Sequence, residues 1–269
     1  MTKRANVAAL LPGSGRHWTS GQCSRVSRPV LWHYMFRCIR PWLLSELLKR
    51  RRVEIAIPIF DGFTALDAIG PYEVLARIPG ATVRFVAEEP GPKRAETRPA
   101  VLTADVAFDE LPAPDIVVVP GGPAARDQPE SHEALLDWLR AAHATSTWTT
   151  SVCTGSLLLG AAGILDGLQA TSHWLALERL RDYGATPVSQ RIVEQEAARV
   201  ITCAGVSAGI DMALALTARL SNPQIAQAIQ LAIEYAPQPP FQAGTPDEAP
   251  KDVVALVQLV AEKERRANA

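Results

Sequence analysis

One cysteine stands out as a residue that could do chemistry, in the stretch TTSVCTGSLLLGAAG at residues 149–163. Threonines and Ser151 lead into Cys153, and leucine and alanine follow at once, which predicts a strand that ends at Cys153 and a buried helix that begins at Thr154. The unpaired N–H groups at a helix N-terminus lower the pKa of a thiol and favour the thiolate. On this local pattern Cys153 is either a nucleophile or a small buried hydrophobic residue, and the two interpretations are balanced.

Three further positions could complete a site around this cysteine. A strand-to-helix turn projects its side chain outward, as in the nucleophile elbows of hydrolases, and aims the Thr154 N–H at a developing oxyanion. Gly122 ends the run DIVVVPGG, where its N–H is a candidate second oxyanion donor, although a simple tight turn would also use these glycines. Asp67, in ALDAIGP, is expected just ahead of a helix, either as a capping residue or as a carboxyl group that passes a proton to and from the thiol.

The remaining histidines and cysteines form no recognisable constellation. His173, in ATSHW, is the other candidate base, but a lone histidine before an apolar helix is typical of a structural hydrogen-bonding residue. The four cysteines include no C-x-x-C pair, and the five histidines include no pair spaced i, i+4. The sequence therefore predicts no metal site, no disulfide framework and no metal cofactor.

The segments that would position these residues alternate between strand and helix signals from residue 53 onward. Continuous apolar runs are typical of strands covered on both faces, as in a parallel sheet, and Pro58 indicates the end of the first strand or a bulge. The predicted strands are 53–60, 81–89, short pieces within 98–108, 115–122 and a hairpin over 191–205, and the predicted helices are 71–77, 130–144, 154–162, 173–183, 207–220, 222–235 and 252–266. This order predicts a doubly wound α/β domain with a mostly parallel sheet and helices on both faces. Reactive groups in such a sheet gather beyond the carboxyl ends of the strands.

The charge is distributed unevenly along the 269 residues. Residues 1–52 contain eleven basic residues and one acidic residue, whereas 53–269 contain 16 basic and 27 acidic residues. An acidic body is a poor partner for nucleic acid. The basic segment 1–52 shows no sustained helical or strand period, so we expect an N-terminal extension without regular structure, ahead of one α/β domain at 53–269.

The sequence also favours a cytoplasmic protein. No apolar run approaches the roughly 20 residues that a membrane-spanning helix needs, and no signal-peptide core is visible, so we expect no membrane partner. The stretch EYAPQPPFQAGTPDEAP, which ends at residue 250, reads as a long Pro-rich connection before the last helix. A connection of this length is usually functional or packs on a partner.

Several motifs together resemble a known superfamily. They are ALDAIGPYEVLA, DIVVVPGG, TTSVCTGSLLLGAAGILDG, ATSHW, AGVSAGIDMALAL and EYAPQPPFQAGTPDEAP. The combination is similar to the PfpI/ThiJ-like superfamily, and within it to the isonitrile (isocyanide) hydratase family. The resemblance covers about 53–266, leaves 1–52 outside, and implies the class I glutamine amidotransferase-like, flavodoxin-like fold.

The resemblance also implies roles for particular residues. The nucleophile of the family falls on Cys153, its acidic partner on Asp67, the residue that helps to position the nucleophile on Thr154, and the strand-end glycine amide on Gly122. It implies a homodimer that needs no cofactor. It further implies a hydro-lyase that converts small apolar isonitriles into N-substituted formamides through a thioimidate on the cysteine, with Asp67 as general acid and base.

Two other classes of function stay open. One is an amidase-like ligand-sensing domain, as in AraC-type transcriptional regulators, although such regulators need a DNA-binding domain and residues 222–269 hold only four basic against six acidic residues. The other is a different thiol activity of the superfamily, such as glycation or aldehyde repair or amide hydrolysis. The fold alone cannot decide among them, because one fold hosts many activities.

Overall fold

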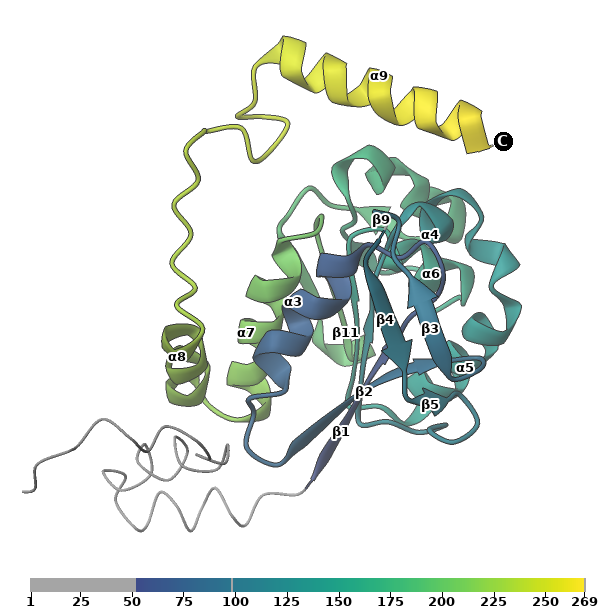
Figure 1. The fold of residues 1–269 in the computed structure, drawn as a ribbon, viewed down its shortest axis with the longest axis vertical. Helices are drawn as coiled ribbons and strands as arrows, with labels where there is room; N and C mark the ends of the chain where they lie inside the picture. The colour runs from purple at the N-terminus through teal and green to yellow at the C-terminus, as the bar shows by residue number, and fades with distance from the viewer. Residues whose placement is uncertain (1–51, 98, 269) are drawn as a thin grey trace, which may run out of the picture. The chain divides into compact units, whose positions relative to one another are not determined.

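The computed structural model describes residues 52–97 and 99–268. The predicted N-terminal extension at 1–52 therefore lies, except for Arg52, outside the described residues, and its prediction stays untested. From residue 53 onward strands and helices alternate as expected (Figure 1). Within the described part of the chain, no helix is both long and apolar enough to span a membrane.

The centre of the fold is a seven-stranded sheet. Its spatial order is β10-β11-β7-β6-β1-β2-β5, and every neighbouring pair is parallel except β10 with β11. These strands are β1 (Val53–Pro58), β2 (Ala81–Ala87), β5 (Val106–Ala107), β6 (Ile116–Val119), β7 (Trp148–Val152), β10 (Ile192–Gln195) and β11 (Val200–Cys203). Two small ribbons stand apart from the sheet, β3 (Gly91–Arg94) with β4 (Val101–Ala104), and β8 (Gln169–Ala170) with β9 (Thr186–Pro187).

Helices cover both faces of this sheet (Figure 1). One face packs against α3 (Ala65–Leu75) and α7 (Ala208–Leu220), with α8 (Pro223–Ala232) against α7. The other face packs against α5 (Glu133–Thr145), α6 (Gly155–Ala161) and the 3-10 segment η3 (Trp174–Tyr183). The short elements α4 (Pro123–Asp127), η2 (Pro129–Ser131) and η4 (Glu196–Ala198) lie in the connections. The predicted doubly wound fold, its parallel strands and the hairpin over 191–205 are confirmed.

The first helix begins earlier than predicted. We expected residues 71–77 to be helical with Pro71 in the first turn, but α3 starts at Ala65 and Pro71 lies inside it. A proline inside a helix removes one backbone hydrogen bond. The packing of α3 against α7 offsets this loss, and a Cβ at Gly70 would lie only 3.1 Å from the Ile210 side chain. Asp67 is consequently in the first turn of the helix rather than ahead of it.

The C-terminal region leaves the sheet after α8. Residues 235–250 form no helix or strand, as predicted, and the last helix α9 (Lys251–Asn268) follows them (Figure 1). We call residues 235–250 the tail. Most of its residues are exposed, including Phe241 at 77%.

Candidate active site

The parallel strands end together at one edge of the sheet. In the register of the sheet Val119 of β6 pairs with Ser151 of β7, and Val152 of β7 pairs with Cys203 of β11. The residues that follow these strands therefore converge. They include Cys153 after β7, the PGG turn after β6 and the segment after β11, while α3 brings Asp67 from the loop after β1.

Cys153 occupies a strained turn between β7 and α6. Its φ of 58° lies in the left-handed region, which is rare for residues other than glycine and is held only when the surroundings enforce it. The Cys153 N–H is shared between the carbonyls of Cys203 and Ala204, at 3.2 and 3.1 Å. The next helix begins at Gly155, where a Cβ would lie 2.2 Å from the Val119 carbonyl oxygen. The predicted strand-to-helix turn is thus confirmed to within one residue.

A second strained residue lies against the same sulfur. Val206 has φ of 41°, a genuine outlier for a β-branched side chain. Its backbone N–H and that of Thr154 both interact with the Cys153 thiol and favour its ionised form. Backbone strain of this kind clusters at functional sites. Two adjacent strained turns thus aim N–H groups at one sulfur atom.

Asp67 is fully buried and lies within interaction range of the thiol. Its Oδ2 accepts a hydrogen bond from the Gly121 N–H at 2.9 Å, while Oδ1 has no hydrogen-bond partner of ordinary geometry among the described residues. Burial raises the pKa of this carboxyl group to about 7, against smaller lowering effects from the Gly121 N–H and the Cys153 thiol. The carboxyl group is therefore present in both protonation states near neutral pH. The structure thus brings Asp67 to the thiol, and its role in proton transfer stays a prediction.

The predicted lowering of the thiol pKa is wrong as a net effect. Burial, followed by the neighbouring Asp67 carboxyl group, raises the pKa of Cys153 well above its usual range, and the N–H groups of Val206 and Thr154 only partly oppose this. The side chain is 5% exposed. The N–H groups at the helix N-terminus lower the thiol pKa as expected, but desolvation raises it by more because the sulfur lies below the surface. The surroundings of Cys153 therefore favour the protonated thiol.

Gly122 and Thr154 bind each other rather than an empty oxyanion position. The Gly122 N–H donates to Thr154 Oγ1 at 2.8 Å, and this hydroxyl donates to the Gly122 carbonyl at 3.0 Å. The expectation that Gly122 supplies a free second donor is therefore wrong for this state, because its N–H is already paired. Gly122 itself has φ of 145°, and a Cβ there would lie 2.3 Å from the Gly62 carbonyl oxygen. The two hydrogen bonds between Gly122 and Thr154 connect the PGG turn to the nucleophile turn.

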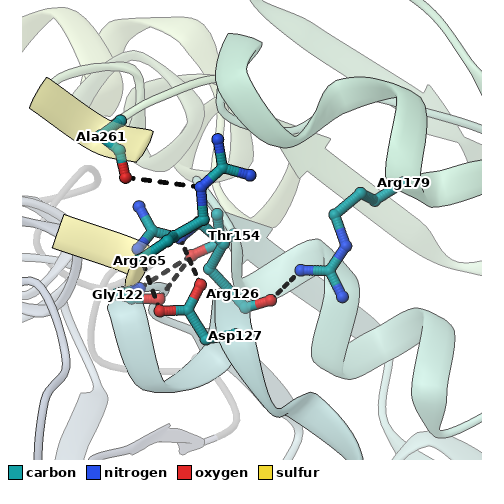
Figure 2. A network of polar contacts seen from close by, with 7 residues as sticks. All are labelled: Gly122, Arg126, Asp127, Thr154, Arg179, Ala261 and Arg265. Atoms are coloured by element: carbon teal, nitrogen blue, oxygen red, sulfur yellow. Dashed lines mark hydrogen bonds and ion pairs between the residues drawn. The ribbon is translucent and has the colours of Figure 1, made fainter. Parts of the chain in front are cut away.

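A network of arginines holds the helix that follows Gly122 (Figure 2). On α4, Arg126 makes two bonds to the Asp127 carboxylate, at 2.7 and 3.0 Å. Arg179, from η3, donates to the Arg126 carbonyl. Figure 2 also shows Arg265 of α9, whose Nε donates to the Ala261 carbonyl at 3.4 Å. The contact between Arg179 and Arg126 fixes α4, and with it the PGG turn, relative to η3.

A cavity of about 540 Å³ lies beside the nucleophile turn. It is lined by 171–174, Leu177, 189–191, 204–207 and 244–247. Ser172 Oγ, in this lining, donates to the Cys153 carbonyl at 3.1 Å. His173 also lines the cavity, and its Nδ1 accepts the Leu175 N–H at 3.3 Å as the N-cap of η3, which is the structural role expected for it. Burial lowers the pKa of His173, so the imidazole is neutral at pH 7.

Sequence reasoning missed two of the groups that contact the reactive pair. The Gly121 amide, rather than that of Gly122, binds Asp67, and the Val206 amide reaches the sulfur. The PGG motif indicated the first within one residue. The sequence gives no signal for the Val206 amide beyond its place soon after the end of β11. Among the described residues, no group of three or more His, Cys, Asp or Glu side chains could hold a metal ion.

Comparison with known proteins places this geometry in context. The model of the DJ-1/PfpI family matches residues 53–219. The chain is 41% identical over 202 residues to isonitrile hydratase from Pseudomonas putida, which covers 75% of this chain and 87% of that protein. A crystal structure of a ThiJ/PfpI family protein from Pseudomonas syringae has a TM-score of 0.76 and 32% identity, and the match covers 87% of this chain and 98% of that one.

A transcriptional regulator is also similar to this chain. The HTH-type regulator CdhR from Pseudomonas aeruginosa is 32% identical over 177 residues, or 64% of this chain. The match spans about half, 51%, of the regulator's own length. The α/β body is thus shared between an enzyme and a part of a regulator.

Proposed function

The chain belongs to the DJ-1/PfpI family, and from that premise we propose that it is an isonitrile hydratase that converts R–N≡C into the N-substituted formamide. The observation that carries the proposal is the buried Asp67 carboxyl group beside the Cys153 thiol at the strand ends. Its 41% identity to the Pseudomonas putida isonitrile hydratase supports the same reaction. A carboxyl group that titrates near pH 7 is suited to both accepting and donating a proton.

The first half of the proposed reaction adds the thiol across the isonitrile carbon. The Asp67 carboxylate takes the proton of Cys153 as the sulfur forms a bond to the terminal carbon. Asp67 then gives that proton to the same carbon, which leaves a thioimidate, R–N=CH–S–Cys. Because the proton moves with the bond formation, the resting enzyme needs no free thiolate, which agrees with the raised pKa of Cys153.

The second half adds water to the thioimidate. Asp67, again a carboxylate, takes a proton from water as the oxygen bonds to the carbon, and hands that proton to the nitrogen. The resulting R–NH–CH(OH)–S intermediate collapses to the formamide, and the departing sulfur regains a proton through Asp67. Thr154 positions the turn through its two bonds to Gly122, and its N–H steadies the sulfur as it leaves. Positioned proton transfer of this kind contributes about 10²–10⁴-fold.

The test is formamide production from methyl and cyclohexyl isocyanide. Cys153→Ala is expected to abolish turnover, because no other group can form the thioimidate. Cys203→Ala is the matched control, since Cys203 is also a buried cysteine, on the adjacent strand, and the variant keeps the backbone carbonyl that accepts the Cys153 N–H. Turnover by Cys153→Ala at the wild-type rate would end the proposal. Tight isocyanide binding by a wild-type protein without turnover would instead favour the ligand-sensing alternative, which the similarity to CdhR supports.

We further propose that the enzyme is a cytoplasmic homodimer that works without nucleic acid, membrane or cofactor. Apolar side chains exposed on α9 support a protein interface, among them Leu256 at 58% and Leu259 at 64%. Light scattering on the purified full chain tests this point, and a monomeric mass would contradict it.

A further inference from the structure

The cavity beside the nucleophile turn extends from two residues that contact Cys153 to the C-terminal tail, and Cys153 and Asp67 are not in its lining. At its inner end, Val206 has the N–H that interacts with the Cys153 sulfur, and Ser172 binds the Cys153 carbonyl. At its outer end lie residues 244–247 of the tail. The R group of an isonitrile lies on the opposite side of the nitrogen from the reacting carbon, so it would point away from the sulfur, and this cavity offers space for it next to Val206 and Ser172.

The outer wall, residues 244–247, is attached mainly through its ends. At the start of the tail, Tyr235 forms a side-chain hydrogen bond with Asp211 and another with Arg191. Arg191 also donates its Nε to Asp211 and itself lines the cavity. At the other end, a turn in which the Glu248 and Ala249 N–H groups bind the Thr245 carbonyl, at 3.2 and 2.9 Å, leads into α9. The body of the domain therefore presents a fixed floor, and the tail supplies a separate wall.

The cavity is larger and more polar than a simple isonitrile requires. Its volume of about 540 Å³ falls within the range of about 300–1,000 Å³ that holds drug-sized ligands. Apolar groups from Trp174 and Leu177 lie in the same lining as polar groups from Ser189, Gln190 and Thr245. A methyl or cyclohexyl group would leave much of this space empty and would not reach all of these polar groups.

We propose that residues 244–247 form a specificity wall, which selects isonitriles whose R group is larger than one six-membered ring and carries a polar substituent. The inference rests on the proposed isonitrile hydration and goes beyond it by naming the substrate class and the residues that select it. Gly244 lines the cavity at this wall and has no side chain. A Cβ added there meets no atom within 4 Å, so the wall can take a larger side chain without a backbone clash.

The experiment compares Gly244→Trp with wild type on two substrates, methyl isocyanide and p-toluenesulfonylmethyl isocyanide. The wild type is expected to favour the larger, polar substrate in kcat/KM. Gly244→Trp is expected to reduce kcat/KM for the larger substrate by about tenfold or more, with less than about a twofold change for methyl isocyanide. Gln242→Trp is the matched control, because Gln242 is exposed on the same tail and does not line the cavity.

Three outcomes would overturn the proposal. They are an unchanged ratio of the two kcat/KM values in Gly244→Trp, an equal loss for both substrates, and the same change of ratio in Gln242→Trp. A wild type that hydrates neither substrate contradicts the proposed function instead. Calorimetry with the two product formamides then tests the wall alone, and equal affinity of wild type and Gly244→Trp for the larger formamide would reject it.

Discussion

The nucleophile turn and the C-terminal tail contribute to the same site, yet they are built in different ways. Around Cys153 nearly every group is buried. The backbone N–H groups of Gly121, Thr154 and Val206, which follow three different strands, contact the Asp67 carboxyl group or the Cys153 thiol. The tail is largely exposed and forms no helix or strand. The first region holds the proposed reacting atoms in place at the expense of backbone strain, whereas residues 244–247 of the second line the cavity proposed for the substrate. Substitutions should therefore have large chemical effects in the first region and selective effects in the second.

Replacing Asp67, the proposed proton-transfer group, should show the largest difference in effect between the nucleophile turn and the tail. Asp67→Asn keeps an acceptor for the Gly121 N–H but cannot take the thiol proton. We expect kcat to fall by about 10²–10⁴-fold, measured as formamide produced from methyl isocyanide. Asp61→Asn is the control, since Asp61 is an exposed carboxylate on the neighbouring loop that binds the Arg94 N–H. Equal losses in the two variants would remove the special role of Asp67.

The buried carboxyl group should also set the dependence of stability and activity on pH. Between the unfolded pKa of 3.8 and the native pKa of about 7, the native state holds a proton that the unfolded state has lost, so this group's contribution to stability falls as pH rises. The three-unit shift corresponds to at most about 4 kcal/mol. Asp67→Asn should therefore gain stability over wild type from pH 4 to pH 8, as measured by urea unfolding. In wild type kcat/KM should rise through about pH 7, because the carboxylate is the active form.

A constant difference in unfolding free energy between Asp67→Asn and wild type across this pH range would contradict the raised pKa. A kcat/KM that falls as pH rises through 7 would instead mean that the protonated carboxyl group starts the reaction.

Thr154→Val should show how far the turn depends on its hydroxyl group. The change leaves the Gly122 N–H and carbonyl without their partner, which costs about 1–3 kcal/mol in unfolding free energy. We expect turnover to fall by about tenfold, since 1.4 kcal/mol of lost positioning is a factor of ten in rate. Thr150→Val is the matched control, because it removes a buried hydroxyl of β7 that donates to the Val117 carbonyl of β6 at 3.0 Å. A similar loss of turnover in both variants would mean that general destabilisation is the cause.

The smallest effect is expected in the tail. Phe241 is 77% exposed, so Phe241→Ala should change the unfolding free energy by less than about 0.5 kcal/mol and leave turnover of methyl isocyanide intact. Chemical denaturation and the formamide assay measure both. A loss above about 1 kcal/mol would show that the tail is packed in solution and would weaken the contrast with the nucleophile turn.

Some of this organisation was predictable from local patterns, and some was not. The apolar run at 115–122 predicted a central strand because both faces of such a strand are covered, and the order of elements predicted the parallel sheet. The start of α3 was missed because Pro71 is a strong signal for a first turn, and tertiary packing overrode it. The raised thiol pKa was missed because desolvation depends on depth below the surface, which a helix N-terminus does not reveal. The Val206 amide depends on a long-range contact that no local pattern records.

The depth of the Cys153 sulfur has a consequence for its fate under oxidative conditions. Peroxide and alkylating reagents attack the thiolate, and Cys153 is only 5% exposed in surroundings that favour the protonated thiol. Under the proposed mechanism, the essential sulfur would thus rest in a form that oxidants modify slowly, whereas a redox-sensing cysteine needs the opposite arrangement. The sulfur would become reactive only when an isonitrile binds and the thiol proton passes to Asp67.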